Sequence, residues 1–244
     1  VTMSFDARES SKIIVALDYN NKKEAIEMAM CLDPNLCKLK VGLELFVSCG
    51  PEIIQDLHAL GYKIFLDLKF HDITNTVVKS CLAASDLGVW MINIHSGGGK
   101  NMMTKCKNEL IKSNQKTLIL GVTILTSMNE NEIREVGYAD NLKDQVLKMA
   151  KLCHESKLDG VVCSSQESKL IKSQFKENFI CVCPGIRNVD DKNNDQKRIS
   201  TPKIAAISGA DYIVVGRPVT KSSDPLASLI AIKKEFDESV HNII

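Results

Sequence analysis

The chain has 244 residues, 44% hydrophobic and 25% charged, which is the composition of an ordinary globular protein and excludes a disordered one. Its formal net charge of +1 provides no strongly basic surface for nucleic acid or anionic lipid. Its apolar runs are shorter than the ~20 residues of a membrane-spanning helix, so we expect neither nucleic acid nor a membrane as a partner.

Nine cysteines are present, and no two of them stand in a Cys-x-x-Cys pair. Most fall in apolar stretches, where a free thiol packs as a small hydrophobic group. The five histidines show no His-x-x-x-His spacing, so the sequence predicts no metal site. Free cysteines are typical of reducing compartments, and we therefore expect a cytoplasmic location.

Short apolar runs of β-forming residues recur along the whole chain. The eight runs are 13–17, 37–41, 63–68, 90–95, 117–124, 160–163, 179–183 and 212–215. Helical periodicity fills segments between them, such as 22–32, 76–84, 141–156 and 225–236. The first run is not followed by Gly-x-Gly-x-x-Gly, which disfavours a dinucleotide-binding sheet. We predict an α/β fold, a single (β/α)8 TIM-barrel domain over 12–244 after a loose leader over 1–11.

The active site of such a barrel lies at the C-terminal ends of its strands. Polar residues stand there after seven of the eight runs: Asp18, Lys40, Asp67 with Lys69, His95 with Ser96, Thr126 with Ser127, Arg187, and Gly216 with Arg217. A polar residue at one strand end usually serves as a cap, but polar residues at seven strand ends indicate a site. His95, like His71, is expected to be a hydrogen-bonded structural residue.

The segment 65–73 carries the strongest chemical signal. Residues two apart on a strand share a face, so Asp67 and Lys69 should lie side by side. Burying a charge costs several kcal/mol unless it is paired, and a structural ion pair would be the ordinary interpretation. Asp72 adds a third charge, and Lys40 needs counter-ions that Asp18 and Asp67 can supply. The five residues predict an electrostatic network that works without metal.

A second site is expected where the last two strands end. Gly216-Arg217-Pro218 combines close backbone approach with a bidentate cation, which suits phosphate. Barrels commonly bind phosphate at this place, and Pro184-Gly185-Ile186-Arg187 adds a turn and another cation. The polar segment 188–198 between them is either a solvated loop or a lid that closes over the ligand.

These motifs together resemble the orotidine 5'-phosphate decarboxylase family in its bacterial monofunctional form. The matching segments are Leu17-Asp18-Tyr19, Lys40-Val41-Gly42, Asp67-Leu68-Lys69-Phe70-His71-Asp72-Ile73, Leu125-Thr126-Ser127, Pro184-Gly185-Ile186-Arg187 and Gly216-Arg217-Pro218. They follow the family's order over nearly the whole chain. The resemblance implies decarboxylation of orotidine 5'-phosphate to UMP, the last step of UMP synthesis, by a cofactor-free and metal-free homodimer with shared active sites.

The resemblance also implies roles for individual residues. The catalytic residues would be Lys69, Asp67, Asp72 and Lys40. The substrate-binding residues would be Asp18, Lys40, Asp67, Thr76, Thr126, Ser127, Arg187, Gln196, Gly216 and Arg217. Lys69 would donate the proton to C6 of the pyrimidine, with Asp67 against the leaving carboxylate. Asp18 and Lys40 would bind ribose, and Ser127, with Thr126 beside it, would contact the pyrimidine. Gln196, Gly216 and Arg217 would hold the phosphate, with Arg187 nearby, while Asp72 and Thr76 would serve the neighbouring subunit.

The chain departs from the family pattern at one position. Bacterial relatives usually read Asp-Ile-Pro-Asn-Thr where this chain has Asp72-Ile73-Thr74-Asn75-Thr76. Without the proline, φ at position 74 is less restricted, which predicts a looser loop. Two other functions stay open at this point: a Mg²⁺-dependent decarboxylase of a sugar phosphate such as 3-keto-gulonate 6-phosphate, and a catalytically silent nucleotide-binding regulator.

Overall fold

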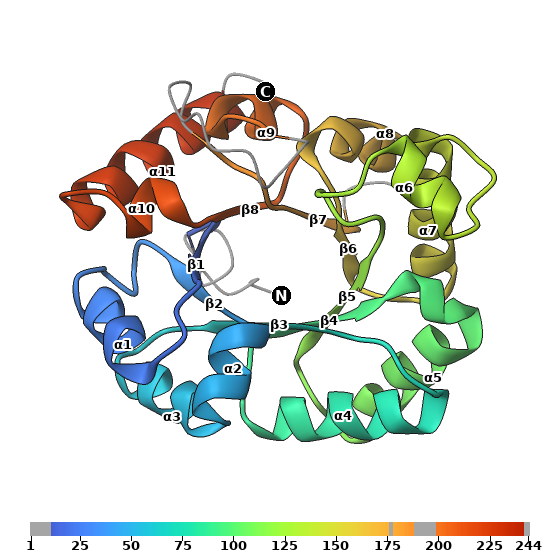
Figure 1. Cartoon of the computed structure of the whole chain (residues 1–244), viewed down its shortest axis with the longest axis horizontal. Coiled ribbons are helices and arrows are strands. Elements are labelled where there is room, and N and C mark those ends of the chain that lie inside the picture. The colour runs from blue at the N-terminus through green and yellow to red at the C-terminus, as the bar shows by residue number, and fades with distance from the viewer. Residues whose placement is uncertain (1–10, 176–177, 188–198, 242–244) are drawn as a thin grey trace, which may run out of the picture.

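Eight parallel strands form a closed barrel in chain order, with β8 returning to pair with β1 (Figure 1). The computed structural model describes residues 11–175, 178–187 and 199–241. The strands are β1 (Ile13–Leu17), β2 (Lys38–Gly42), β3 (Ile64–Phe70), β4 (Met91–His95), β5 (Leu118–Val122), β6 (Gly160–Val162), β7 (Ile180–Cys183) and β8 (Tyr212–Val215). The predicted (β/α)8 barrel is thereby confirmed.

Helices surround the strands as an outer ring in Figure 1. They are α1 (Lys22–Met30), α2 (Leu43–Cys49), α3 (Glu52–Ala59), α4 (Thr74–Asp86), η2 (Ser96–Gly98), α5 (Gly99–Lys112), α6 (Glu130–Glu135), α7 (Leu142–Glu155), α8 (Ser165–Phe175), α9 (Pro202–Ile207), α10 (Arg217–Thr220) and α11 (Pro225–His241). In the part of the chain that the structure describes, these helices are all too short or too polar to cross a membrane.

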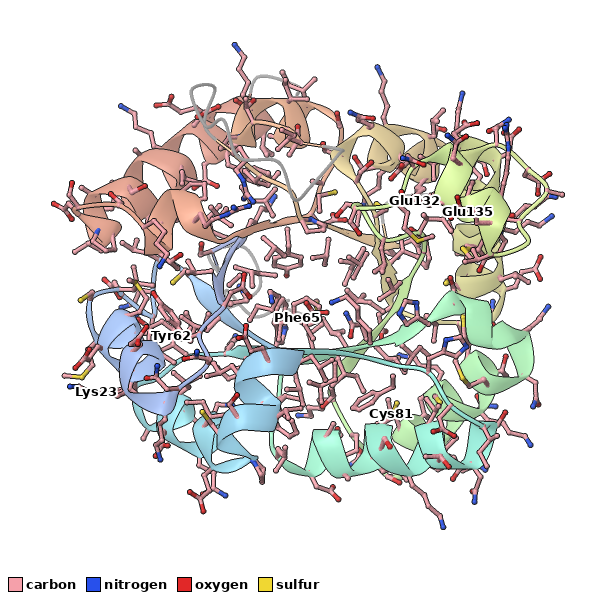
Figure 2. All side chains as sticks on the ribbon, viewed as in Figure 1. Lys23, Tyr62, Phe65, Cys81, Glu132 and Glu135 are labelled. Atoms are coloured by element: carbon pink, nitrogen blue, oxygen red, sulfur yellow. The ribbon has the colours of Figure 1, made fainter. Side chains whose placement is uncertain are left out.

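Most strands are apolar on both faces because both faces are buried. Ile14 and Ala16 of β1 point into the barrel, where they join a small inner core with Phe65. Ile13 and Val15 belong to the larger core between strands and helices. Figure 2 shows Phe65 within the ring of strands. Continuous burial explains why the strands appear in the sequence as unbroken apolar runs.

The ends of the elements differ from the predicted ranges by a few residues. The third strand continues to Phe70, beyond its predicted end at residue 68, and the fourth helix begins at Thr74, earlier than predicted. Thr74 therefore occupies the first turn of α4, where proline would also be accepted. Hydrophobic pattern marks the buried middle of an element, whereas its ends are set by caps and turns.

Closure of the barrel between β6 and β7 depends on a glycine. A Cβ atom at Gly160 would lie 2.1 Å from the carbonyl oxygen of Ile180, on the paired strand. Backbone atoms cannot move aside without breaking the strand ladder, so a side chain is excluded here.

Lys38 lies inside the barrel at the N-terminal end of β2, opposite the end where the site is predicted. Its side chain is 4% exposed and its Nζ donates to the carbonyl oxygen of Ser11. The Nζ also lies 5.0 Å from the ring centre of Trp90 and 5.2 Å from that of Tyr212. Burial, followed by the nearby charge of Lys63, lowers the pKa of Lys38 to about 8.

The lowered pKa of Lys38 predicts a pH-dependent stability. An unfolded chain regains the ordinary lysine pKa of 10.5, so between pH 8 and 10.5 it binds more protons than the folded chain. The contribution of Lys38 to the free energy of unfolding therefore rises with pH across that window, with a slope of at most about 1.4 kcal/mol per pH unit. Urea unfolding of the wild type and Lys38→Met between pH 7 and 10 should show this rise only in the wild type.

The exposed Lys12→Met variant is the matched control, because it removes a lysine from the same end of the barrel without removing a buried charge. It should keep the pH dependence of the wild type. If Lys38→Met and Lys12→Met follow the same pH profile, Lys38 does not titrate in this window.

Candidate active site

A cavity of about 240 Å³ opens at the C-terminal ends of the strands. Its lining residues come from β1, β2, β3, β5, β6, β7 and β8 and the turns after them: Ala16, Asp18, Lys40, Phe65, Asp67, Lys69, Val122, Ile124, Leu125, Thr126, Val162, Pro184, Gly185, Arg187, Val214, Gly216 and Arg217. One side of the cavity therefore carries paired charges, and apolar side chains cover much of the rest.

Lys40 lies between two carboxylates, as its position on the inner face of β2 predicts. Its Nζ is 3.1 Å from Asp18 Oδ1 and 3.4 Å from Asp67 Oδ2. Burial alone would lower the pKa of Lys40, but Asp67 and then Asp18 outweigh it and raise the pKa above its ordinary value. Gly42 leaves room for this ammonium, since a Cβ atom there would lie 3.0 Å from Nζ. Lys40 is thus held as a cation.

Asp67 is the buried centre of the charged group. Burial by itself would raise the pKa of this carboxyl, but the ammonium groups of Lys40 and Lys69 hold it below the usual range. Lys69 Nζ lies 2.7 Å from Oδ1, which confirms the predicted ion pair. Lys69 keeps 35% of its side chain exposed, whereas Asp67 keeps 11%. The carboxylate is therefore fixed, while the ammonium beside it remains accessible from the cavity.

The third strand is irregular where these two residues stand. Leu66 pairs with Ile92 of β4, but the next pair joins Phe70 to Ile94, so the register shifts between them. Lys69 has a positive φ of 51°, a conformation that costs a non-glycine residue about 1–3 kcal/mol. A regular strand was the expectation from the sequence. The bulge instead changes the direction in which the Lys69 side chain leaves the strand, and this side chain lines the cavity.

Asn93 is a site residue that the sequence analysis missed. It lies on β4, is fully buried, and its amide contacts both Asp67 and Lys69. The available signal was one polar residue within the apolar run Met91-Ile92-Asn93-Ile94. Its significance could not be recognised without knowing that it faces the bulge of β3. The apolar lining residues Phe65, Val162 and Val214 were missed as well, because inner and outer positions of a buried strand look alike.

Gly216, Arg217 and Arg187 line the cavity from β7 and β8, where phosphate binding was predicted. Gly216 precedes the short helix α10, and Arg217 is its first residue. Arg187 is buried, and its backbone N–H donates to Ser200 across an isolated bridge that joins Ile186 and Ser200. Gln196 and the proposed lid at 188–198 lie outside the described residues.

Three predicted site residues lie apart from the cavity of their own chain. Asp72, Thr76 and Ser127 are exposed and are not among its lining residues, although Thr126 is. The Asp72 carboxylate accepts the N–H of Ile73 at 2.6 Å and, within the described part of this chain, makes no ion pair with Lys69. The predicted five-residue network thus comprises four residues within one chain.

The rings of the two histidines near the site lie against one another in a tilted arrangement. The rings of His71 and His95 have centroids 5.4 Å apart and an interplanar angle of 37°. Burial lowers the pKa of His95, and the neighbouring His71 and Lys69 lower it further against an opposing effect of Asp67. Ser96 donates to the carbonyl oxygen of Val122 at 2.7 Å, which is a structural bond between β4 and β5.

The described residues contain no group of three or more His, Cys, Asp or Glu side chains arranged to hold a metal ion. In the cavity, the carboxylates Asp18 and Asp67 are already paired with the lysine Lys40. What this arrangement can do chemically is to hold fixed charges of both signs against a ligand, with Lys69 as a proton source.

The closed barrel and a charged cavity at its C-terminal rim define the chain as a (β/α)8-barrel enzyme with an electrostatic active site. The family model described as "Orotidine 5'-phosphate decarboxylase / HUMPS family" matches residues 11–232. The chain belongs to this family.

Curated bacterial relatives match nearly the full length of the chain. The orotidine 5'-phosphate decarboxylase of Chromobacterium violaceum is 45% identical over 231 residues, which cover 95% of this chain and 94% of that protein. That of Hydrogenovibrio crunogenus is 46% identical over 227 residues, covering 93% and 96%. The crystal structure of orotidine 5'-phosphate decarboxylase from Lactobacillus acidophilus superposes with a TM-score of 0.83 and 38% identity, covering 93% of this chain and all of that one.

Proposed function

We propose that this chain is a carboxy-lyase that converts orotidine 5'-phosphate to uridine 5'-phosphate and CO₂, the last step of UMP synthesis. The family match and the full-length relatives support the activity. The observation that carries the mechanism is the buried Asp67 carboxylate held between the ammonium groups of Lys40 and Lys69 at the wall of the cavity.

The chemical difficulty lies in the electron pair that CO₂ leaves at C6 of the pyrimidine. This pair lies in the plane of the ring, where the π system cannot delocalise it, so charge must be stabilised by groups outside the ring. The Lys69 ammonium, directed into the cavity beside Asp67, is suited to stabilise that charge and then to deliver its proton to C6. The C–CO₂ bond breaks, a C6–H bond forms, and Lys69 is left neutral until it regains a proton.

Asp67 has two tasks in this scheme. It fixes the position of Lys69 through the 2.7 Å contact, and its negative charge faces the substrate carboxylate that is lost as neutral CO₂. The second contact, with Lys40, prevents Asp67 from taking up a proton itself. Lys40 and Asp18 then remain at the rim of the cavity, where they can bind the ribose hydroxyl groups.

The phosphate supplies binding energy away from the reacting atoms. Arg217 offers a charge-assisted bidentate hydrogen bond, and Gly216 lets the backbone approach the oxygens; Arg187 adds positive charge. One general acid accounts for about 10²–10⁴-fold of rate, whereas enzymes lower barriers by up to about 23 kcal/mol. Binding of the phosphate group, which fixes the geometry of the reacting atoms, is suited to contribute part of the remaining reduction of the barrier. Ser127, with Thr126 beside it, would contact the pyrimidine; of the two, Thr126 lines the cavity.

The second part of the proposal is a homodimer whose active sites are shared. Asp72 and Thr76 are exposed and lie outside their own cavity, which suits a role in a neighbouring copy. Apolar side chains near the ends of β2 and β3 are also exposed: Leu43 by 61%, Val47 by 74% and Ile73 by 73%. A second copy of the chain would cover this apolar surface and bring Asp72 of one subunit to Lys69 of the other.

We further propose a cytoplasmic location and no partner other than substrate and the second subunit. All nine cysteines are free thiols, which suits a reducing compartment. The net charge of +1 gives no electrostatic basis for nucleic-acid or membrane binding. The two alternatives, a Mg²⁺-dependent sugar-phosphate decarboxylase and a silent regulator, are not favoured. Full-length relatives named orotidine 5'-phosphate decarboxylase argue against the former, and the presence of Asp18, Lys40, Asp67 and Lys69 against the latter.

The deciding experiment follows the absorbance change as orotidine 5'-phosphate is consumed, with EDTA present throughout. We expect turnover at an unchanged rate with and without the chelator, because lysine ammonium groups already stand where a cation would be useful. Activity that EDTA removes and Mg²⁺ restores would favour the metal-dependent alternative. A folded protein that binds UMP without consuming orotidine 5'-phosphate would favour the regulator.

A further inference from the structure

Asn93 makes two hydrogen bonds that join it to both members of the Asp67–Lys69 pair. Its Nδ2 donates to Asp67 Oδ1 at 2.6 Å, and its Oδ1 accepts the backbone N–H of Lys69 at 2.8 Å. The side chain is fully buried, so water does not compete for either bond. The orientation of the amide follows from its partners, because a carboxylate can only accept and a backbone N–H can only donate.

The bulge of β3 explains why a side chain is needed at this place. From Leu66 to Phe70 the third strand advances four residues, while its partners on β4 advance only from Ile92 to Ile94. Asn93 is the residue of β4 that faces the bulge. Its Oδ1 provides the acceptor for the N–H of Lys69, which the regular ladder does not supply there, and this bond holds Lys69 at φ 51°.

The same amide completes the surroundings of the carboxylate. Asp67 Oδ1 receives Asn93 Nδ2 and Lys69 Nζ, while Oδ2 faces Lys40 Nζ at 3.4 Å. Asn93 therefore fixes the position of the Asp67 carboxylate and also that of the Lys69 backbone N–H group.

We propose that Asn93 is the positioning residue of the active site, which sets the Lys69 ammonium and the Asp67 carboxylate in their reactive arrangement through one amide. The inference rests on the proposed function. Asn93 acts through its two neighbours, with no contact to substrate required. A displacement of about 1 Å in a catalytic group can cost about 10²-fold in rate, so loss of either bond should appear in kcat.

The first test compares Asn93→Ala with Thr117→Val. Thr117 is also buried and polar, and its Oγ1 donates to Val89 and contacts Ser85 Oγ, but it lies just before β5 at the opposite end of the barrel. Both variants lose buried hydrogen bonds and should lose stability. Asn93→Ala should lower kcat at least about tenfold with KM changed less than threefold, whereas Thr117→Val should keep kcat within twofold.

The Asn93→Asp variant changes the hydrogen bond to Asp67 but keeps the one from the Lys69 N–H. It also provides a test of the proposal if the alanine variant does not fold. It keeps the shape and the acceptor for Lys69 N–H, but it places a second carboxylate against Asp67. Two carboxylates at this distance cannot both ionise readily, so the pair takes up a proton as the pH falls. The pair with one shared proton has the same net charge and the same donor toward Asp67 as the wild type.

The ratio of kcat for Asn93→Asp to that of the wild type should therefore rise as the pH is lowered from 8 to 5. Lys40, Lys69 and His95 lie near Asp67, and His71 lies against His95. These groups are the same in both proteins, so the ratio reports the change at position 93. A residue with only a structural role would give a ratio that does not vary with pH.

The outcomes distinguish this inference from the proposed function. A wild type that does not consume orotidine 5'-phosphate refutes the function, and the inference with it. An active wild type together with an Asn93→Ala variant that keeps more than about a tenth of kcat refutes the inference alone. So does an Asn93→Asp ratio that stays flat across the pH range. A kcat loss confined to the Asn93 variants, with a pH-dependent ratio, supports the positioning role.

Discussion

Replacement of Lys69 by alanine is expected to lower kcat by at least about 10²–10⁴-fold, the usual effect of removing a general acid. The loss should be larger still, because the same change removes the ammonium proposed to stabilise charge at C6 and leaves Asp67 with one fewer cation. Binding of UMP should change little, since the proposed phosphate-binding residues Arg217 and Gly216 line another part of the cavity. Steady-state kinetics and UMP titration measure the two effects separately.

The matched control for this prediction is Lys107→Ala. Lys107 is also a partly buried lysine paired with an aspartate, at 2.6 Å from Asp159, but it does not line the cavity. Its removal should affect stability and leave kcat near the wild-type value. The assignment of Lys69 as proton donor fails if Lys69→Ala keeps more than a tenth of wild-type kcat.

Mixing two inactive variants is expected to restore activity if the active sites are shared. Lys69→Ala and Asp72→Asn should each be nearly inactive alone, since each chain would spoil both sites of its own homodimer. In a mixed dimer, one site combines both lesions and the other pairs an intact Lys69 with an intact Asp72. With equal amounts and random exchange, roughly a quarter of all sites should regain wild-type chemistry. Activity after exchange under mild denaturant measures this fraction.

A second mixture provides the control. Lys69 and Asp67 lie in the same site of the same chain, 2.7 Å apart. A mixed dimer of Lys69→Ala and Asp67→Asn therefore carries one lesion in every site and should stay inactive. Exchange itself is verified by differently tagged subunits. If the first mixture exchanges without recovering activity, Asp72 serves its own chain and the shared site is wrong.

Part of the candidate site could be predicted because its members are near one another in the sequence. The spacing of two between Asp67 and Lys69 placed both on one strand face, and the structure contains the ion pair. The counter-ions of Lys40 were predicted because a buried lysine on an inner strand face needs them. The role of Asn93 depends on a contact between strands about 25 residues apart, and no local pattern reports it.

The sequence by itself determined the eightfold alternation of strands and helices, and hence the barrel. Strands buried on both faces appear as unbroken apolar runs, and polar residues at their ends mark the C-terminal rim. The tertiary structure alone decided the bulge at Lys69, the face of Asn93 and the burial of Lys38 between Trp90 and Tyr212. These features depend on the register between strands, which sets which side chains face each other across the barrel, and register is a property of the closed sheet rather than of any one segment.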